Sequence, residues 1–99
     1  MNASDTEQLF EVFYDGQCAI CTREINMLRK LDRRQRIVFT DIADASFDAL
    51  GQTGRTYETL MDEIHGRFED GTVVTGVEVF RQLYARVGFG WAVGITRLF

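Results

Sequence analysis

The chain has 99 residues, of which 45% are hydrophobic and 26% are charged, and its formal net charge is −4. This length is enough for one domain with its own hydrophobic core, and the composition is ordinary for a soluble globular protein. The acidic balance argues against a nucleic-acid partner, and no apolar run approaches the roughly 20 residues needed to span a bilayer.

The first predicted elements are a leader and a strand. Residues 1–8 are polar and acidic and lack the apolar stretch of a secretory signal peptide. We therefore expect a flexible leader and a cytoplasmic location, where a cysteine pair is more often redox-active or metal-binding than a permanent cross-link. Residues 9–14 carry aromatic and β-branched side chains, which predicts a strand.

A helix is predicted over residues 19–33. Its apolar positions recur at helical spacing, and they are Cys21, Ile25, Leu28 and Leu31. This spacing predicts that Cys21 lies on the buried face of the helix, while Cys18 lies at the helix start. Residues 37–42 predict a second strand, and a strand-helix-strand unit of this kind predicts parallel pairing with a right-handed crossover.

The middle of the chain predicts two short helices. Asp44 or Ser46 is expected to cap the first, which should end at Gly51. Apolar residues at helical spacing predict the second over residues 57–64.

Residues 63–75 predict a hairpin around Asp70-Gly71, a dipeptide that suits a type I′ turn. A last helix is predicted from Val77 to Val87, ending at Gly88. The order β-α-β-α-β-β-α is that of an α/β, thioredoxin-like domain, a four-stranded mixed sheet flanked by helices. We assign it residues 9–88.

The apolar tail 89–99 is expected to pack on its own domain or on a partner. A homodimer formed through this tail is one such arrangement.

The two cysteines of the chain form a single Cys-x-x-Cys pair between the first predicted strand and helix. The N-terminus of a helix stabilises a thiolate through its unpaired N–H groups and its positive dipole end. Cys18 is therefore the expected attacking nucleophile. Cys21 is the expected resolving thiol, which releases a mixed disulfide.

Residues 14–21 read Tyr-Asp-Gly-Gln-Cys-Ala-Ile-Cys. This segment closely resembles the signature of the DCC family of thiol-disulfide oxidoreductases, also called DUF393. The Asp, Cys and Cys of that name are matched by Asp15, Cys18 and Cys21. The resemblance covers roughly residues 9–88 and is weaker in the second half. It implies an enzyme that acts on protein or small-molecule disulfides with an unidentified reductant and no bound cofactor.

Four neighbours of the dithiol are candidate supporting residues. Asp15 would relay a proton or hydrogen-bond loop N–H groups. Gly16 is expected to permit the turn, and Tyr14 belongs to the same motif. His65, the one histidine, begins the strand that runs close to the dithiol in this fold, where it would stabilise a thiolate, supply a third metal ligand, or be purely structural or solvent-exposed.

The chain departs from thioredoxins in one respect, because it contains no proline. Thioredoxins place a cis-proline beside the dithiol, and its counterpart here falls near Glu63 or Ile64. A different mode of substrate recognition is therefore expected.

Two other functions stay open. A metal-binding module for zinc or copper would use the same thiolates, although a closed zinc site needs four ligands and we assign no metal site. A non-catalytic thioredoxin-like interaction domain is the second alternative.

Overall fold

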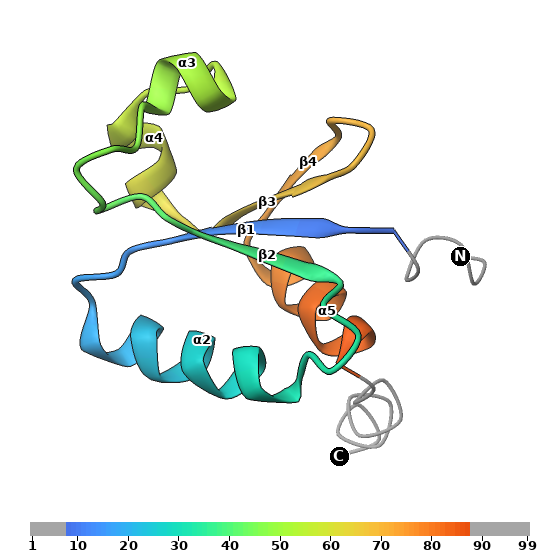
Figure 1. Cartoon of the computed structure of the whole chain (residues 1–99). Helices are drawn as coiled ribbons and strands as arrows, with labels where there is room; N and C mark the ends of the chain where they lie inside the picture. Colours follow the sequence, from blue (N-terminus) through green and yellow to red (C-terminus); the bar gives the residue numbers. More distant parts are fainter. Residues whose placement is uncertain (1–7, 88–99) are drawn as a thin grey trace.

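The computed structural model describes residues 8–87 (Figure 1). Residues 1–7 and 88–99 lie outside the described part of the chain. Most of the predicted leader, the predicted helix end at Gly88, the tail 89–99 and its homodimer contact therefore fall outside the described residues and stay predictions.

A four-stranded mixed sheet forms the centre of the molecule. Its strands are β1 (Phe10–Tyr14), β2 (Ile37–Asp41), β3 (His65–Phe68) and β4 (Val73–Thr75), in the spatial order β2-β1-β3-β4. β1 pairs in parallel with β2 and antiparallel with β3, and β3 pairs antiparallel with β4. The parallel pairing predicted for the first two strands is confirmed.

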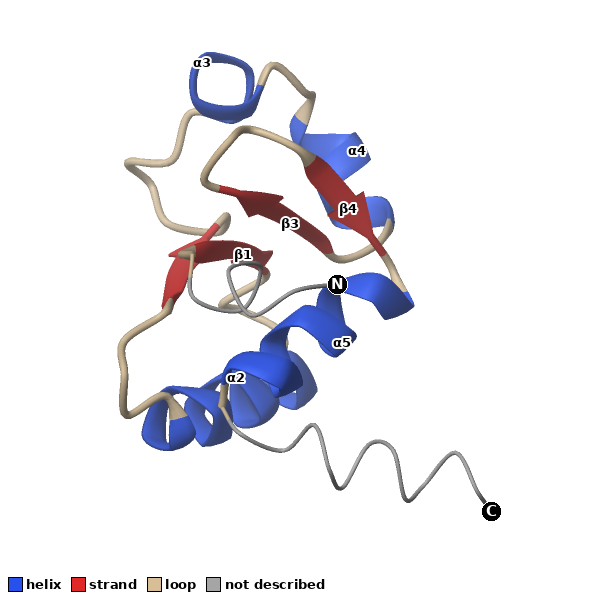
Figure 2. Cartoon of the chain, turned by 90° about the vertical axis from the view of Figure 1, so that its right-hand side faces the viewer, coloured by secondary structure: helices blue, strands red, loops and turns tan. Residues whose placement is uncertain are grey.

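Helices cover both faces of this sheet. α2 (Ala19–Leu31) and α5 (Val77–Arg86) lie on one face, and the short helices α3 (Ala49–Thr53) and α4 (Tyr57–Asp62) lie beyond the other (Figures 1 and 2). The observed order differs from the predicted one by one helix, because both α3 and α4 lie between β2 and β3. The four-stranded mixed sheet flanked by helices is that of a thioredoxin-like fold, as predicted.

The main hydrophobic core fills the space between the sheet and the helices α2 and α5. Its buried members are Phe10, Val12, Ile25, Leu28, Ile37, Val79 and Leu83. A second, smaller cluster consists of Phe13, Ile42 and Leu60. Each such side chain contributes about 1.5–3 kcal/mol through burial. Because Leu60 comes from α4, the second cluster ties α4 to the end of β1.

The end of α2 differs from the prediction by two residues. The helix stops at Leu31 because Asp32 caps it and turns the chain into β2. The carboxylate of Asp32 accepts the N–H groups of Arg36 at 2.9 Å and Ile37 at 3.0 Å.

The predicted caps and end of the first short helix are wrong. α3 begins after Asp48, whose carboxylate accepts the N–H of Gly51 at 3.2 Å, and it ends at Gly54 with φ 75°. Asp44 and Ser46 instead form a local turn, in which the Ser46 N–H donates to Asp44 at 2.8 Å.

The following helix and turn also differ from the predictions. α4 ends at Asp62, two residues before the predicted end. The hairpin loop is not a type I′ turn, because among the described non-glycine residues only Gln35 has positive φ. Phe68 pairs with Thr72, and Gly71, with φ 93°, closes a three-residue loop.

Candidate active site

The dithiol lies at the N-terminus of α2, as the sequence predicts. Cys18 is the N-cap residue, in extended conformation with φ −85° and ψ 117°. Its Sγ accepts a hydrogen bond from the backbone N–H of Cys21 at 3.4 Å. Both cysteines are free thiols; Cys18 is half-buried and Cys21 is exposed. This end of α2 therefore holds a sulfur where the helix N–H groups stabilise negative charge.

The prediction that Cys21 is buried is wrong. Cys21 follows the same stripe of α2 as Ile25 and Leu28, which are 2% and 0% exposed. However, α2 begins beyond the C-terminal end of β1 (Figure 1), where the sheet no longer covers the helix. Cys21 consequently faces a pocket at the edge of the domain rather than the core.

The two thiols differ in acidity. Hydrogen bonds from the thiol of Cys21, and then from its backbone N–H, hold the pKa of Cys18 below its ordinary value. The thiol of Cys21 donates this hydrogen bond to Cys18. That donation, together with the smaller effect of partial burial, raises the pKa of Cys21 to about 11. The negative charge of Asp15 opposes ionisation of both thiols as a smaller effect. Cys18 is therefore the thiol that ionises first.

Asp41, which sequence reasoning did not single out, holds the loop before the dithiol. Its Oδ1 accepts the N–H groups of Gly16 and Ala43, each at 2.8 Å. A Cβ at position 16 would lie 2.0 Å from Asp41 Oδ2. Gly16 is not among the glycines of positive φ. The loop therefore needs glycine for close approach to this carboxylate, and not for a left-handed backbone conformation.

Asp15 organises the same loop. Its Oδ1 accepts the N–H of Gln17 at 3.0 Å, and its main-chain oxygen accepts the N–H of Cys18 at 3.1 Å. Asp15 also lines the pocket beside the two cysteines. Of the two predicted roles, these contacts fit loop structuring directly, and the position of Asp15 also keeps a proton relay geometrically open.

A pocket of about 480 Å³ lies against both cysteines. Residues from α2, α4, α5 and the segment just before β3 surround it together with the end of β1. It is lined by Phe13, Tyr14, Asp15, Cys18, Ile20, Cys21, Glu24, Ile25, Ile42, Leu60, Met61, Glu63, Ile64 and Phe80. Its walls are mainly apolar, and three carboxylates interrupt them.

Tyr14 and Glu24 add polar groups to this pocket. The hydroxyl of Tyr14 accepts a hydrogen bond from Arg29 at 3.3 Å. The carboxylate of Glu24 accepts a hydrogen bond from the Tyr84 hydroxyl. Burial, followed by this contact with Glu24, raises the pKa of Tyr84 to about 12. Sequence reasoning missed Glu24, although its position three residues after Cys21 makes it a neighbour on the helix surface.

His65 does not line the pocket. It is buried at 4% exposure, its Nδ1 lies 2.8 Å from the main-chain oxygen of Glu63, and it pairs in register with Phe13. Glu63 and Ile64 do line the pocket, at the place predicted for the counterpart of the missing proline. The structure therefore brings the predicted residues Tyr14, Asp15 and both cysteines together, and leaves His65 outside.

Within residues 8–87, no group of three or more His, Cys, Asp or Glu side chains is arranged to hold a metal ion. The described residues thus offer the two thiolates no third ligand.

Among the helices of residues 8–87, none is long and apolar enough to cross a membrane.

A thioredoxin-like domain that presents a Cys-x-x-Cys pair at a helix N-terminus has the architecture of a thiol-disulfide exchange protein. Comparison with known families agrees. The family model described as DCC1-like thiol-disulfide oxidoreductase matches residues 12–99, so the chain belongs to this family. The resemblance carried by Asp15, Cys18 and Cys21 is thereby confirmed.

A relative from Arabidopsis thaliana is described as an uncharacterized, chloroplastic protein. It is 42% identical to this chain over 88 residues, which are 88% of this chain and 41% of the relative. The chain therefore spans about two fifths of the length of that relative. No solved structure matches the chain.

Proposed function

We propose that the chain is a dithiol-disulfide oxidoreductase in which Cys18 attacks and Cys21 resolves. The Cys18 thiolate attacks one sulfur of a substrate disulfide and forms a mixed disulfide, while the other sulfur leaves as a thiolate and takes up a proton. The thiolate of Cys21 then attacks Cys18 Sγ, releases the second substrate thiol and forms the Cys18–Cys21 disulfide. Two electrons pass from the dithiol to the substrate, and a separate reductant returns them.

The observation that carries this assignment is the asymmetric pair at the start of α2. Cys18 Sγ accepts hydrogen bonds at the helix N-terminus, so its pKa falls, whereas Cys21 donates and its pKa rises to about 11. The more acidic thiol is the better attacking group at neutral pH, and the less acidic one keeps its proton until the mixed disulfide has formed.

The second step needs a proton acceptor for Cys21, and we assign this role to Glu24. Side chains three residues apart are neighbours on a helix, and both of these residues line the pocket. The Tyr84 hydroxyl donates a hydrogen bond to the Glu24 carboxylate and holds it in place. Asp15 is the competing acceptor, because it lines the same pocket. Each of the two carboxylates already accepts a hydrogen bond, from Tyr84 and from Gln17 respectively.

The partners of the reaction are a disulfide or dithiol substrate and a reductant, and the proposal requires no bound cofactor. The cytoplasmic location expected from the sequence stays a prediction. The metal-binding alternative would need ligands from outside residues 8–87 or from a second chain. The interaction-domain alternative requires that the dithiol never cycles.

Equilibrium titration of the purified chain against reduced and oxidised glutathione tests the proposal. The expected result is a reversible two-electron transition with an intramolecular disulfide in the oxidised form, which Cys18→Ser abolishes. Failure to form that disulfide would overturn the redox assignment. Stoichiometric zinc or copper in protein purified without chelator would instead support the metal-binding alternative.

A further inference from the structure

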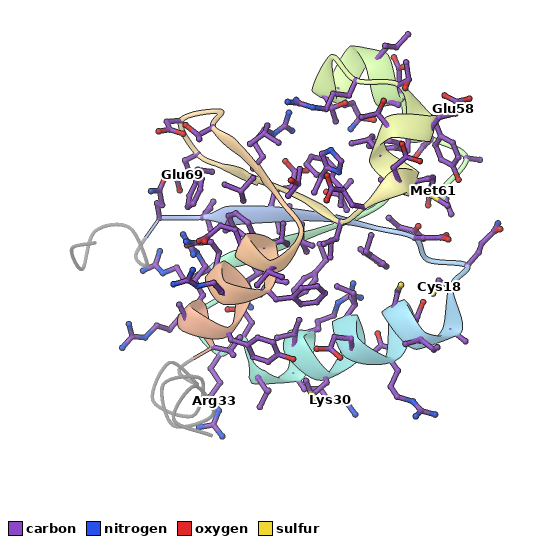
Figure 3. The ribbon with its side chains drawn as sticks, turned by 180° about the vertical axis from the view of Figure 1, so that it is seen from behind. Cys18, Lys30, Arg33, Glu58, Met61 and Glu69 are labelled. Atoms are coloured by element: carbon purple, nitrogen blue, oxygen red, sulfur yellow. The ribbon has the colours of Figure 1, made fainter. Side chains whose placement is uncertain are left out.

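The walls of the pocket beside the dithiol favour an apolar occupant. Ile20 is 82% exposed and Met61 is 42% exposed, and both line the pocket. Figure 3 shows Met61 on α4 and Cys18 at the N-terminus of α2 at the same end of the molecule, and both residues line the pocket. Covering exposed apolar side chains gains free energy in proportion to the area removed from water. A substrate that places an apolar group between α2 and α4 is therefore favoured.

The charge of the pocket has one sign. Asp15, Glu24 and Glu63 line it, and among the described residues that line it none is Lys, Arg or His. Within residues 8–87 none of these three carboxylates forms an ion pair, since the ion pairs there join Glu11 to Arg67 and Glu78 to Arg81.

None of the cations of α2, all of them described, lines the pocket. Arg29 donates to the hydroxyl of the pocket residue Tyr14, and this cation stands against the three carboxylates. Arg23 and Lys30 line a separate groove with Ala19 and Asn26. They therefore do not neutralise the pocket, which attracts positive charge and repels negative charge. The tripeptide glutathione is a poor fit for such a site, because its disulfide carries more carboxylates than ammonium groups.

From these two properties we infer the substrate class, and this inference rests on the function proposed above. The pocket selects a disulfide in a polypeptide segment whose cysteine has an apolar side chain on one side and a basic side chain on the other. A volume of about 480 Å³ accommodates the cysteine and one apolar neighbour. The carboxylates at its edge then lie beside the basic group. Anionic disulfides, including that of glutathione, are the disfavoured class.

Single-turnover oxidation of the reduced chain by matched peptide disulfides tests this inference. The probes are the symmetric disulfides of the blocked tripeptides Leu-Cys-Lys, Leu-Cys-Gln, Leu-Cys-Glu and Gly-Cys-Lys. Each rate is divided by the rate at which dithiothreitol reduces the same disulfide. This normalisation removes differences in the intrinsic reactivity of the four disulfides. We expect the normalised rate for Leu-Cys-Lys to exceed that for Leu-Cys-Glu by about tenfold at low salt and less at high salt. It should also exceed that for Gly-Cys-Lys.

A pair of variants locates the effect. Glu63→Gln should lower the ratio of the Lys to the Glu peptide by about threefold, because it removes one charge from the pocket. Glu58→Gln is the control, because it changes the net charge by the same amount. Glu58 lies on α4 (Figure 3) and does not line the pocket, so this variant should leave the ratio unchanged. Ile20→Ser should reduce the preference for Leu-Cys-Lys over Gly-Cys-Lys.

The possible failures are distinguishable. If the uncharged Leu-Cys-Gln disulfide does not oxidise the dithiol, the proposed function itself fails. If that disulfide reacts but the normalised rates follow neither charge nor the apolar side chain, only the inferred substrate class is overturned. A normalised preference for glutathione disulfide over Leu-Cys-Lys would also overturn it.

Discussion

Gly16 and Asp41 approach each other so closely that no side chain fits between them. The Gly16 N–H donates to Asp41 Oδ1 at 2.8 Å, and a Cβ on Gly16 would lie 2.0 Å from Asp41 Oδ2. The contact joins the loop before Cys18 to the end of β2. It therefore fixes the position of the helix N-terminus that carries the dithiol.

Gly16→Ala should destabilise the protein and displace the dithiol loop. Overpacking of this kind typically costs about 1–3 kcal/mol, and it should also slow disulfide exchange because α2 would begin in a different position. Urea unfolding and the rate of Cys18 oxidation measure the two effects. In the double variant with Asp41→Ala the added cost of Gly16→Ala should shrink, since the clashing carboxylate is gone. Equal costs in both backgrounds would contradict the proposed contact.

Cys21→Ser should trap mixed disulfides, whereas Cys18→Ser should form none. Cys18 retains its position at the helix N-terminus in the first variant, but no thiol follows to release the substrate. Mass spectrometry after exposure to a peptide disulfide distinguishes the two. Since neither cysteine is buried, both variants should unfold within about 0.5 kcal/mol of the wild type. Mixed disulfides on Cys21 alone would reverse the assigned order.

The rate of Cys18 alkylation should reach half its maximum at a pH below the pKa of an ordinary thiol, which is about 8.5. The pKa of Cys18 is lowered because Cys21 donates to its thiolate, so the reactive fraction is already present as pH rises toward that value. Cys21→Ala removes the thiol donor and should move the profile to higher pH. Asp15→Asn removes an opposing charge and should move it to lower pH. While Cys18 is unmodified, Cys21 should react only near pH 11, and iodoacetamide kinetics with peptide mapping follow each thiol.

Glu24→Gln should slow resolution of the mixed disulfide by about tenfold or more, because general bases typically contribute at least that much to a proton transfer. With the uncharged Leu-Cys-Gln disulfide, whose attraction to the pocket does not depend on the charge of Glu24, the first step should be unaffected. Rapid acid quench after mixing with a peptide disulfide would then show the mixed disulfide accumulating in the variant. Asp15→Asn is the matched comparison. If Asp15→Asn causes the accumulation and Glu24→Gln does not, Asp15 is the proton acceptor.

The sequence predicts the parts of this fold that depend on local pattern. Helical and alternating periodicity predicted the helices and strands, and the strand-helix-strand spacing predicted the parallel pair β1–β2. Around His65 the residues alternate between the two faces of the sheet, as in any strand. Ile64 lines the pocket, and Gly66 packs against Phe10, whereas His65 pairs with Phe13.

The sequence pattern could not predict contacts between residues that are distant along the chain. Periodicity places Cys21 on the stripe of Ile25, but it does not show where the sheet stops covering that stripe. The contact between Gly16 and Asp41 joins residues 25 positions apart. Likewise, no local signal indicates that Leu60 and Met61 of α4 face the dithiol.

Gly66→Ala, a substitution remote from the dithiol, should lower the stability of the protein without changing the chemistry of the dithiol. A Cβ at Gly66 would lie 2.2 Å from Cζ of Phe10, which is fully buried between the sheet and its helices. Gly66→Ala must therefore displace this ring or bend β3, and it should cost about 1–3 kcal/mol. Urea unfolding measures the loss. Because neither residue lines the pocket, the pH profile of Cys18 alkylation in the folded variant should match that of the wild type. A shifted profile would show that packing in the core controls the acidity of the dithiol. It would contradict the assignment of that acidity to the local hydrogen bonds from Cys21.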